Sequence, residues 1–328
     1  MAAIIILLVA LPIILIGAEL FTNAIEHVGM VFGVSEGVTG SLLAAVGTAL
    51  PETAVPVLAS FQAGGGAGVA VGAVLGAPLM LSTLTMAVIG LTAVLSRGFA
   101  GRLTPELAGL HRDLEWFLVL FGLAFLGLFL PLGPLRLLLA AGLVVGYGAY
   151  VRATLQASSG LVARGHGTTA NAVLLLARLR LQRVPGLRYL QLALGLALIL
   201  TGAQLFVGGI EQLGQFLRAP VLVLALVIVP IATELPEKVN SIFWVRRHQD
   251  TLAFGNVTGA LVFQGSLLPA LGLMLTPWQA SPLLVISMLT TMAGVGYLRI
   301  RSASGIRAGQ VLVVGLLYAA FVGYLLAL

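Results

Sequence analysis

The sequence predicts an all-α polytopic membrane protein with ten transmembrane helices, arranged as two inverted five-helix repeats. Of its 328 residues, 59% are apolar and 9% are charged, whereas a soluble domain carries about 25% charged residues. A helix needs about 20 apolar residues to cross a hydrocarbon core of about 30 Å. Ten stretches meet this requirement: residues 3–25, 37–61, 68–95, 115–131, 134–153, 187–212, 220–245, 252–275, 280–298 and 308–327.

The composition also excludes several classes of protein. The 17 Lys and Arg and 11 Asp and Glu residues are too few to cover a soluble enzyme or a disordered chain. The net charge of +6 does not indicate a nucleic-acid partner, because the arginines lie in the predicted loops. The lack of Cys rules out disulfides, haem attachment and thiolate metal sites. The sequence contains no hydrolase or metalloprotease motif, so we expect neither enzyme activity nor a cofactor.

The arginines predict the orientation of the chain, because cytoplasmic loops carry the excess of Lys and Arg. Loops on one side hold fourteen arginines, and the opposite side holds only Arg136 and Arg218. Both termini are therefore expected outside, in a prokaryotic inner or plasma membrane. In the cytoplasmic linker, residues 170–182 are either a short amphipathic helix on anionic lipid or a plain solvated basic loop. The sequence leaves the oligomeric state open.

An internal repeat relates the two halves of the chain. Three motifs recur 183 to 185 residues later: Gly17–Glu26 as Gly202–Glu211, Thr48–Glu52 as Thr233–Glu237, and Gly72–Gly76 as Gly255–Gly259. The chain therefore divides into a first repeat, a cytoplasmic linker and a second repeat: residues 1–153, 154–186 and 187–328. Because each repeat holds an odd number of helices, the second is inverted relative to the first. Inverted repeats place substrate sites near the midplane of secondary transporters.

Two glutamates, Glu52 and Glu237, occupy equivalent positions of the two repeats within predicted spans. A carboxylate at the centre of a membrane helix costs about 2.5–3.5 kcal/mol, so it normally faces a cavity, pairs with another group or binds an ion. Each follows a proline, which frees backbone carbonyl oxygens, and each lies four residues after a threonine, Thr48 or Thr233. Such hard oxygen ligands suit Na⁺ and Ca²⁺. The pattern therefore predicts a cation site built on these four residues.

A third acid, Glu234, lies beside this motif, four residues before Lys238. In one interpretation Lys238 neutralises Glu234 and stands in for a bound cation. In the other, Lys238 extends toward the cytoplasmic face and leaves Glu234 and Glu237 free for a divalent ion. Glu19 is a candidate for an access path. Glu26 and Glu211 lie near helix ends and are expected to be solvated.

These motifs resemble the sodium/calcium exchangers of the cation/calcium antiporter superfamily, and the chain is similar to a divergent prokaryotic member. The family carries a G-T-S-x-P-E helix in each repeat, and residues 47–52 here read Gly-Thr-Ala-Leu-Pro-Glu while residues 232–237 read Ala-Thr-Glu-Leu-Pro-Glu. The resemblance implies that Glu52 and Glu237 are the paired acids of the ion site. It also implies that the first and sixth helices slide past a central group of ion-binding helices.

The chain departs from the family in the second motif of each repeat, G-N-x-x-G-S-N/D-I-F. Ala77 and Pro78 replace its serine and amide in the first repeat, and Leu261 replaces its Asn or Asp in the second. The leading hypothesis is a secondary cation antiporter that exchanges Ca²⁺ for H⁺ or Na⁺, with membrane lipids and small inorganic cations as its partners. The alternatives are a transporter of a different solute and a non-transporting scaffold that kept the fold but lost the full ion cage.

Overall fold

The computed structural model describes residues 2–31, 50–62, 66–162, 173–179, 186–218, 220–303 and 305–327. Within these ranges seven helices are long and apolar enough to cross a membrane, and a shorter apolar helix covers residues 221–231. The prediction of a helical membrane protein is thus confirmed. The count of ten spans and the inverted repeats stay predictions, since much of the expected span 37–61 lies outside the described residues.

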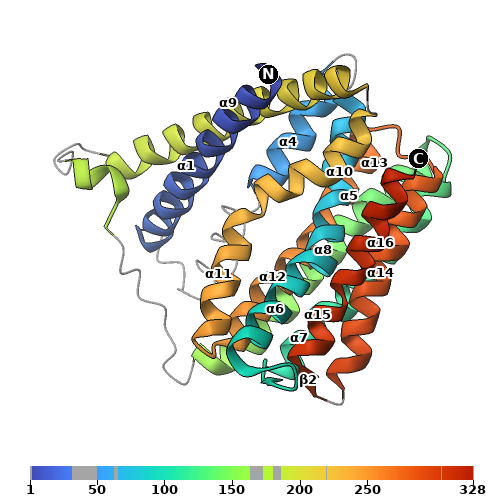
Figure 1. The fold of residues 1–328 in the computed structure, drawn as a ribbon. Helices are drawn as coiled ribbons and strands as arrows, with labels where there is room; N and C mark the ends of the chain where they lie inside the picture. Colours follow the sequence, from blue (N-terminus) through green and yellow to red (C-terminus); the bar gives the residue numbers. More distant parts are fainter. Residues whose placement is uncertain are drawn as a thin grey trace.

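The elements follow the predicted apolar stretches, but several of these stretches are divided by breaks. In chain order they are α1 (Ala2–Val31), α4 (Leu50–Ser60), α5 (Gly66–Met80), η2 (Leu81–Thr85), α6 (Met86–Arg97), β1 (Arg102–Leu103), α7 (Leu107–Leu126), η3 (Gly127–Phe129), α8 (Pro134–Val162), η4 (Leu175–Leu179), α9 (Leu187–Leu217), α10 (Val221–Thr233), α11 (Leu235–Arg246), α12 (Asp250–Gln264), α13 (Leu267–Leu275), α14 (Pro282–Ser302), β2 (Ile306–Arg307), α15 (Ala308–Val313) and α16 (Gly315–Leu326). Figure 1 shows them as a bundle in which α1 and α9 lie side by side along one flank.

The closest helix packing in the described bundle depends on small residues. A Cβ atom added to Gly17 or Gly195 would lie within 3 Å of backbone atoms of the partner helix, which holds α1 directly against α9. Gly72 and Gly76 of α5 face α10 in the same way, and a Cβ at Gly76 would meet the Leu226 carbonyl oxygen at 2.4 Å. Small residues four apart are the usual means of close helix approach in membranes. Gly72 and Gly76 therefore let α5 approach α10 closely.

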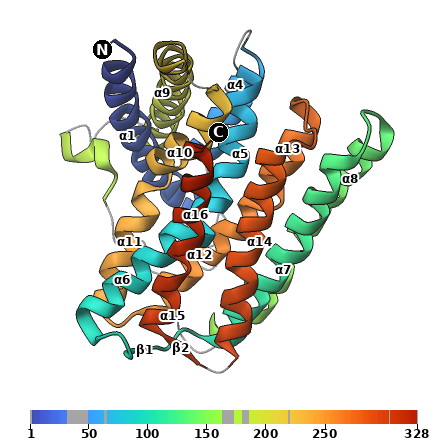
Figure 2. The same cartoon turned by 45° about the vertical axis from the view of Figure 1, so that its right-hand side comes forward.

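One end of the bundle is closed by paired loops. β1 and β2 form a two-stranded antiparallel ribbon that joins the α6–α7 loop to the α14–α15 loop. Figure 2 shows this ribbon at the lower end of the bundle, while the labelled ends of the chain lie toward the upper end. The arginines at positions 97, 102, 299, 301 and 307 belong to the helix ends and loops around this ribbon. These arginines, which the sequence places on the cytoplasmic side, therefore gather at one end of the bundle, and the orientation of that end in the membrane stays a prediction.

The described part of the linker packs on the protein. η4 buries Leu176 and Ala177 in a cluster with Leu187, against which Leu20 of α1 packs. Gln191 Nε2 of α9 donates to Asn23 Oδ1 of α1, and Gln191 Oε1 accepts from the Leu176 N–H. For residues 170–182 the sequence left an amphipathic helix and a solvated loop open, and the described residues 173–179 hold the 3₁₀ helix η4, whose apolar side chains contact α1 and α9. Residues 170–172 and 180–182 lie outside the described residues.

Candidate cation site

The second-repeat motif forms a break between two helices. α10 ends at Thr233 and α11 begins at Leu235, with Glu234 between them at φ −94° and ψ 10°. Pro236 has no N–H group, so it cannot supply the hydrogen bond that would continue α10. Backbone oxygens at such a break are available to ligands, as in the discontinuous helices of transporters.

Glu234 and Lys238 meet at this break. The Glu234 side chain is completely buried and that of Lys238 is 11% exposed. Lys238 Nζ lies 3.3 Å from Glu234 Oε2 and donates to the carbonyl oxygen of Pro230 at 3.2 Å. The lysine therefore points back along its helix toward the break, the direction that helical side chains favour. It places a positive charge beside an acid of the predicted site.

Glu52 lies in the first turn of α4 and is 3% exposed. α4 contacts α5, α9 and α10, so the helices of both predicted motifs belong to one packed group. Thr233 is also buried, and its hydroxyl donates to the Val229 carbonyl oxygen at 3.2 Å. The Thr233 oxygen keeps its lone pairs and is still able to contact a cation.

Other predicted residues are not placed together by the structure. Thr48 and the side chain of Glu237 lie outside the described residues, although Glu237 itself belongs to the first turn of α11. The pairing of Glu52 with Glu237 therefore stays a prediction. Within the described ranges no group of three or more His, Cys, Asp and Glu side chains gathers as a metal site. Glu19 is exposed on α1, Glu211 is half-buried on α9, and the Glu26 side chain is likewise outside the described part.

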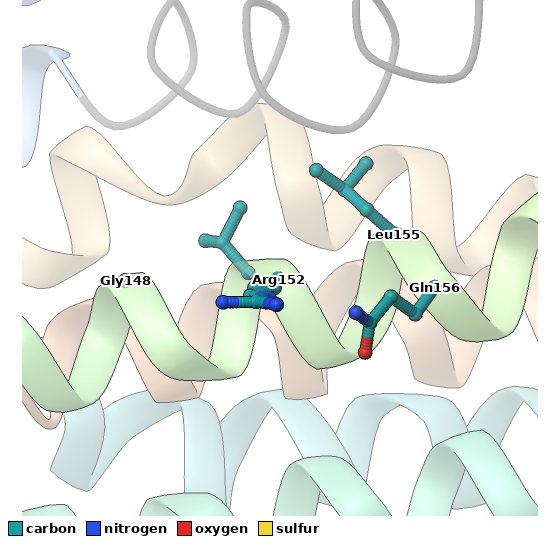
Figure 3. A pocket seen from close by; sticks show the side chains of 5 residues that line it. Gly148, Arg152, Leu155 and Gln156 are labelled. Atoms are coloured by element: carbon teal, nitrogen blue, oxygen red, sulfur yellow. The ribbon is translucent and has the colours of Figure 1, made fainter.

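One surface groove lies on α8, away from these acids. It is lined by Gly148, Val151, Arg152, Leu155 and Gln156 (Figure 3). Its lining has a positive side chain and no carboxylate, which is the wrong charge for a cation. We do not assign this groove to the cation site.

Sequence reasoning missed a polar network that centres on Asp113 of α7. Asp113 is buried and accepts hydrogen bonds from Thr258 of α12 at 2.7 Å and from Tyr150 of α8 at 3.1 Å. The sequence reading began the fourth span at residue 115 and so left this acid in a loop. In the structure α7 begins at Leu107, eight residues earlier, and this extension carries Asp113 into the bundle.

Arg136 lies at the start of the predicted span 134–153 and makes a contact that the sequence did not predict. It belongs to the first turn of α8, is 2% exposed, and donates to the Trp278 carbonyl oxygen. Trp278 in turn donates from Nε1 to the Ala124 carbonyl oxygen at 3.3 Å. Arg136 therefore joins the start of α8 to the segment that follows α13.

A comparison with protein families decides the class of the chain. The sequence model described as "Sodium/calcium exchanger protein" matches residues 2–156 and 187–327. The chain belongs to the sodium/calcium exchanger family. The two matched segments are separated by residues 157–186.

Individual curated relatives are distant in sequence. The chain is 27% identical over 282 residues to the inner membrane protein YrbG of Escherichia coli K12, covering 84% of this chain and 81% of that protein. It is 34% identical over 86 residues to the putative antiporter CaxA of Alkalimonas amylolytica, a match that spans 27% of CaxA and 26% of this chain.

Solved exchanger structures have the same fold. The H⁺/Ca²⁺ exchanger CAX superposes with a TM-score of 0.72 at 18% identity, covering 99% of this chain and 82% of CAX. The sodium–calcium exchanger NCX_Mj superposes with a TM-score of 0.61 at 21% identity, covering 98% of each chain.

The departures from the exchanger motif lie deep in this structure. Ala77, Pro78 and Leu261 are buried and apolar, so they bring no side-chain oxygen to the site. The π-helix η2 follows α5, shortly after Pro78. In η2 the Ser82 and Thr83 hydroxyls donate to the Leu79 carbonyl oxygen. π-Helical turns inside α-helices often occur at functional sites. Of the predicted ligands, Glu52 lies on α4, Thr233 on α10 and Glu237 on α11.

Proposed function

We propose that this chain is a secondary active antiporter that binds a cation near mid-membrane between Glu52 and Glu237. Bound Ca²⁺ is exchanged for H⁺ or Na⁺ by alternating access. The observation that carries the proposal is the burial of Glu52, 3% exposed, at a motif position of an exchanger chain. A carboxylate so far from water in a membrane bundle requires a positive species or a proton beside it.

The architecture proposed for transport has ten spans in two inverted repeats, with both termini outside. The break at Glu234 supplies backbone oxygens for the site, in the manner of other discontinuous transporter helices. The contact between α1 and α9, lined by Gly17 and Gly195, supports their movement as one unit past the site. The two helices also share one apolar cluster, with Ile14 and Phe21 of α1 packed among α9 side chains such as Phe206, so they are held together as a pair.

The proposed coupling ion is H⁺ or Na⁺. The site is expected to bind few ions at a time. Pro78 and Leu261 leave it without two side-chain ligands of the family motif. The remaining ligands of Glu52, Glu237, Thr48 and Thr233 suit one cation rather than several. A carboxylate-dominated site takes protons in place of the cation, and CAX, the structure with the higher TM-score, is described as an H⁺/Ca²⁺ exchanger.

Flux measurements in proteoliposomes test the proposal. Purified protein should take up radioactive Ca²⁺ when a proton or Na⁺ gradient is imposed, and Glu52→Gln and Glu237→Gln should each abolish uptake. Glu115→Gln is the matched control, because Glu115 is 56% exposed on α7 and pairs with Arg299. Uptake that survives both site substitutions would disprove the site. The lack of any cation flux in the wild-type protein would favour the scaffold.

A further inference from the structure

We propose that the Lys238 ammonium is a tethered cation that takes the place of a monovalent ion beside the transported Ca²⁺. This inference rests on the proposed function and concerns the same site. It assigns Lys238 a role in setting how many ions the site holds. Lys238 is a positioning residue here, because its charge acts on the site through Glu234.

The ammonium has the surroundings of a bound cation. Among the described residues, its oxygen neighbours are a carboxylate, Glu234 Oε2 at 3.3 Å, and a backbone carbonyl, that of Pro230 at 3.2 Å. These are the oxygen types that hold metal cations in proteins, at about 2.3–2.6 Å for Ca²⁺. A metal ion that approached the same two oxygens would meet the ammonium and be repelled by it. The position is therefore filled by the protein itself.

The Lys238 side chain points away from the end of the bundle at which a lysine of α11 would reach water. Lys238 contacts Pro230, eight residues earlier, so its chain runs back toward the break between α10 and α11. The end of the bundle that carries β1, β2 and the exposed Arg246 lies in the opposite direction along α11. A lysine that reached for water would extend toward that end. The observed direction favours a charge held within the site.

The charges of the proposed site indicate how many cations it binds. Glu52, Glu234 and Glu237 carry three negative charges, and Lys238 returns one positive charge. The remaining two negative charges match one divalent cation. Without the ammonium, one negative charge in the Ca²⁺-loaded site would lack compensation, which is strongly unfavourable away from water. Such a site would need a monovalent co-cation bound together with each Ca²⁺.

The test measures Ca²⁺ uptake into proteoliposomes in choline medium at alkaline external pH, where Na⁺, K⁺ and protons are scarce. Wild-type protein and Lys238→Arg, which keeps the charge, should not need added monovalent cations. Uptake by Lys238→Gln should fall about a hundredfold, the scale set by an uncompensated buried charge. Added Na⁺, added K⁺ or a lower external pH should restore it. In the double variant Glu234→Gln/Lys238→Gln, the charge balance of the wild type returns, so the dependence should disappear.

The outcomes separate this inference from the proposed function. Uptake by Lys238→Gln that equals wild-type uptake in choline would reject the tethered cation and leave the antiporter intact. If Lys238→Gln is inactive under every condition, the double variant decides: recovered uptake supports the charge argument, and continued inactivity rejects it. The absence of Ca²⁺ flux in the wild type would reject both proposals. Lys238 is the only lysine of the chain, so these variants leave no other lysine to substitute for it.

Discussion

The guanidinium of Arg97 binds both carboxylate oxygens of Asp250, with two hydrogen bonds of 2.7 Å. Arg97 ends α6 and Asp250 begins α12, so each charge also complements the dipole of its own helix. The Thr104 N–H donates to Asp250 as well, at 2.8 Å. The pair therefore ties two helices and the α6–α7 loop together at the end of the bundle that carries β1 and β2.

Loss of one partner from this pair should destabilise the protein strongly. Asp250 is 1% exposed and Arg97 is 10% exposed, and removal of one partner of a buried ion pair costs about 3–5 kcal/mol. We expect Arg97→Ala to show this loss in denaturant unfolding of the detergent-solubilised protein. The matched control is Arg299→Ala, which breaks the exposed pair with Glu115 and should cost about 0–1 kcal/mol. Equal losses in the two variants would contradict this account.

A methyl group at Gly76 should disturb both stability and transport. The added Cβ would lie 2.4 Å from the Leu226 carbonyl oxygen and 2.7 Å from Pro230 Cγ. Neither neighbour is able to rotate away, and forced overpacking costs about 1–3 kcal/mol. Displacement of Pro230 would also move the oxygen that contacts Lys238. We expect Gly76→Ala to lower both the unfolding free energy and the Ca²⁺ uptake rate.

The control for this substitution is Gly142→Ala on α8. A Cβ at Gly142 would meet no atom within 4 Å, so alanine should be neutral or stabilise the helix by up to about 1 kcal/mol. A Gly76→Ala variant that unfolds and transports like Gly142→Ala would show that α5 and α10 are less tightly packed than the structure indicates.

The sequence predicted the helical membrane fold because hydropathy is a local signal. It did not predict that Asp113 enters the bundle, since its partners Thr258 and Tyr150 lie on two other helices. It left two directions open for Lys238, because the contact with the Pro230 carbonyl depends on how the chain bends between α10 and α11. Hydrogen-bond partners on other helices, or across a break in a helix, depend on the tertiary structure and cannot be predicted from local sequence patterns.

Loss of the Thr258 hydroxyl should weaken the network around Asp113. Thr258→Val keeps the shape of the side chain but removes the donor at 2.7 Å from the carboxylate. A hydrogen bond to a charged group contributes about 1.5–3 kcal/mol, and unfolding in denaturant should show a loss of this size. Thr290→Val is the comparison, since the Thr290 hydroxyl donates only to the Ile286 carbonyl of its own helix. A Thr258→Val loss no larger than that of Thr290→Val would mean that Asp113 does not depend on this bond.

The single lysine allows the contact between Lys238 and Glu234 to be followed by chemical labelling. An amine-reactive acetylating reagent must reach the amine, and the contacts with Glu234 and the Pro230 carbonyl hold Lys238 Nζ at a site where its side chain is only 11% exposed. Mass spectrometry of the labelled protein should therefore find Lys238 unmodified in the folded wild type and acetylated after unfolding in SDS. Glu234→Gln removes the carboxylate partner and should raise the labelling rate of the folded protein at least several-fold, whereas Glu115→Gln should leave it unchanged. Labelling of the folded wild type as fast as that of the unfolded chain would show that the ammonium is not held at the break between α10 and α11.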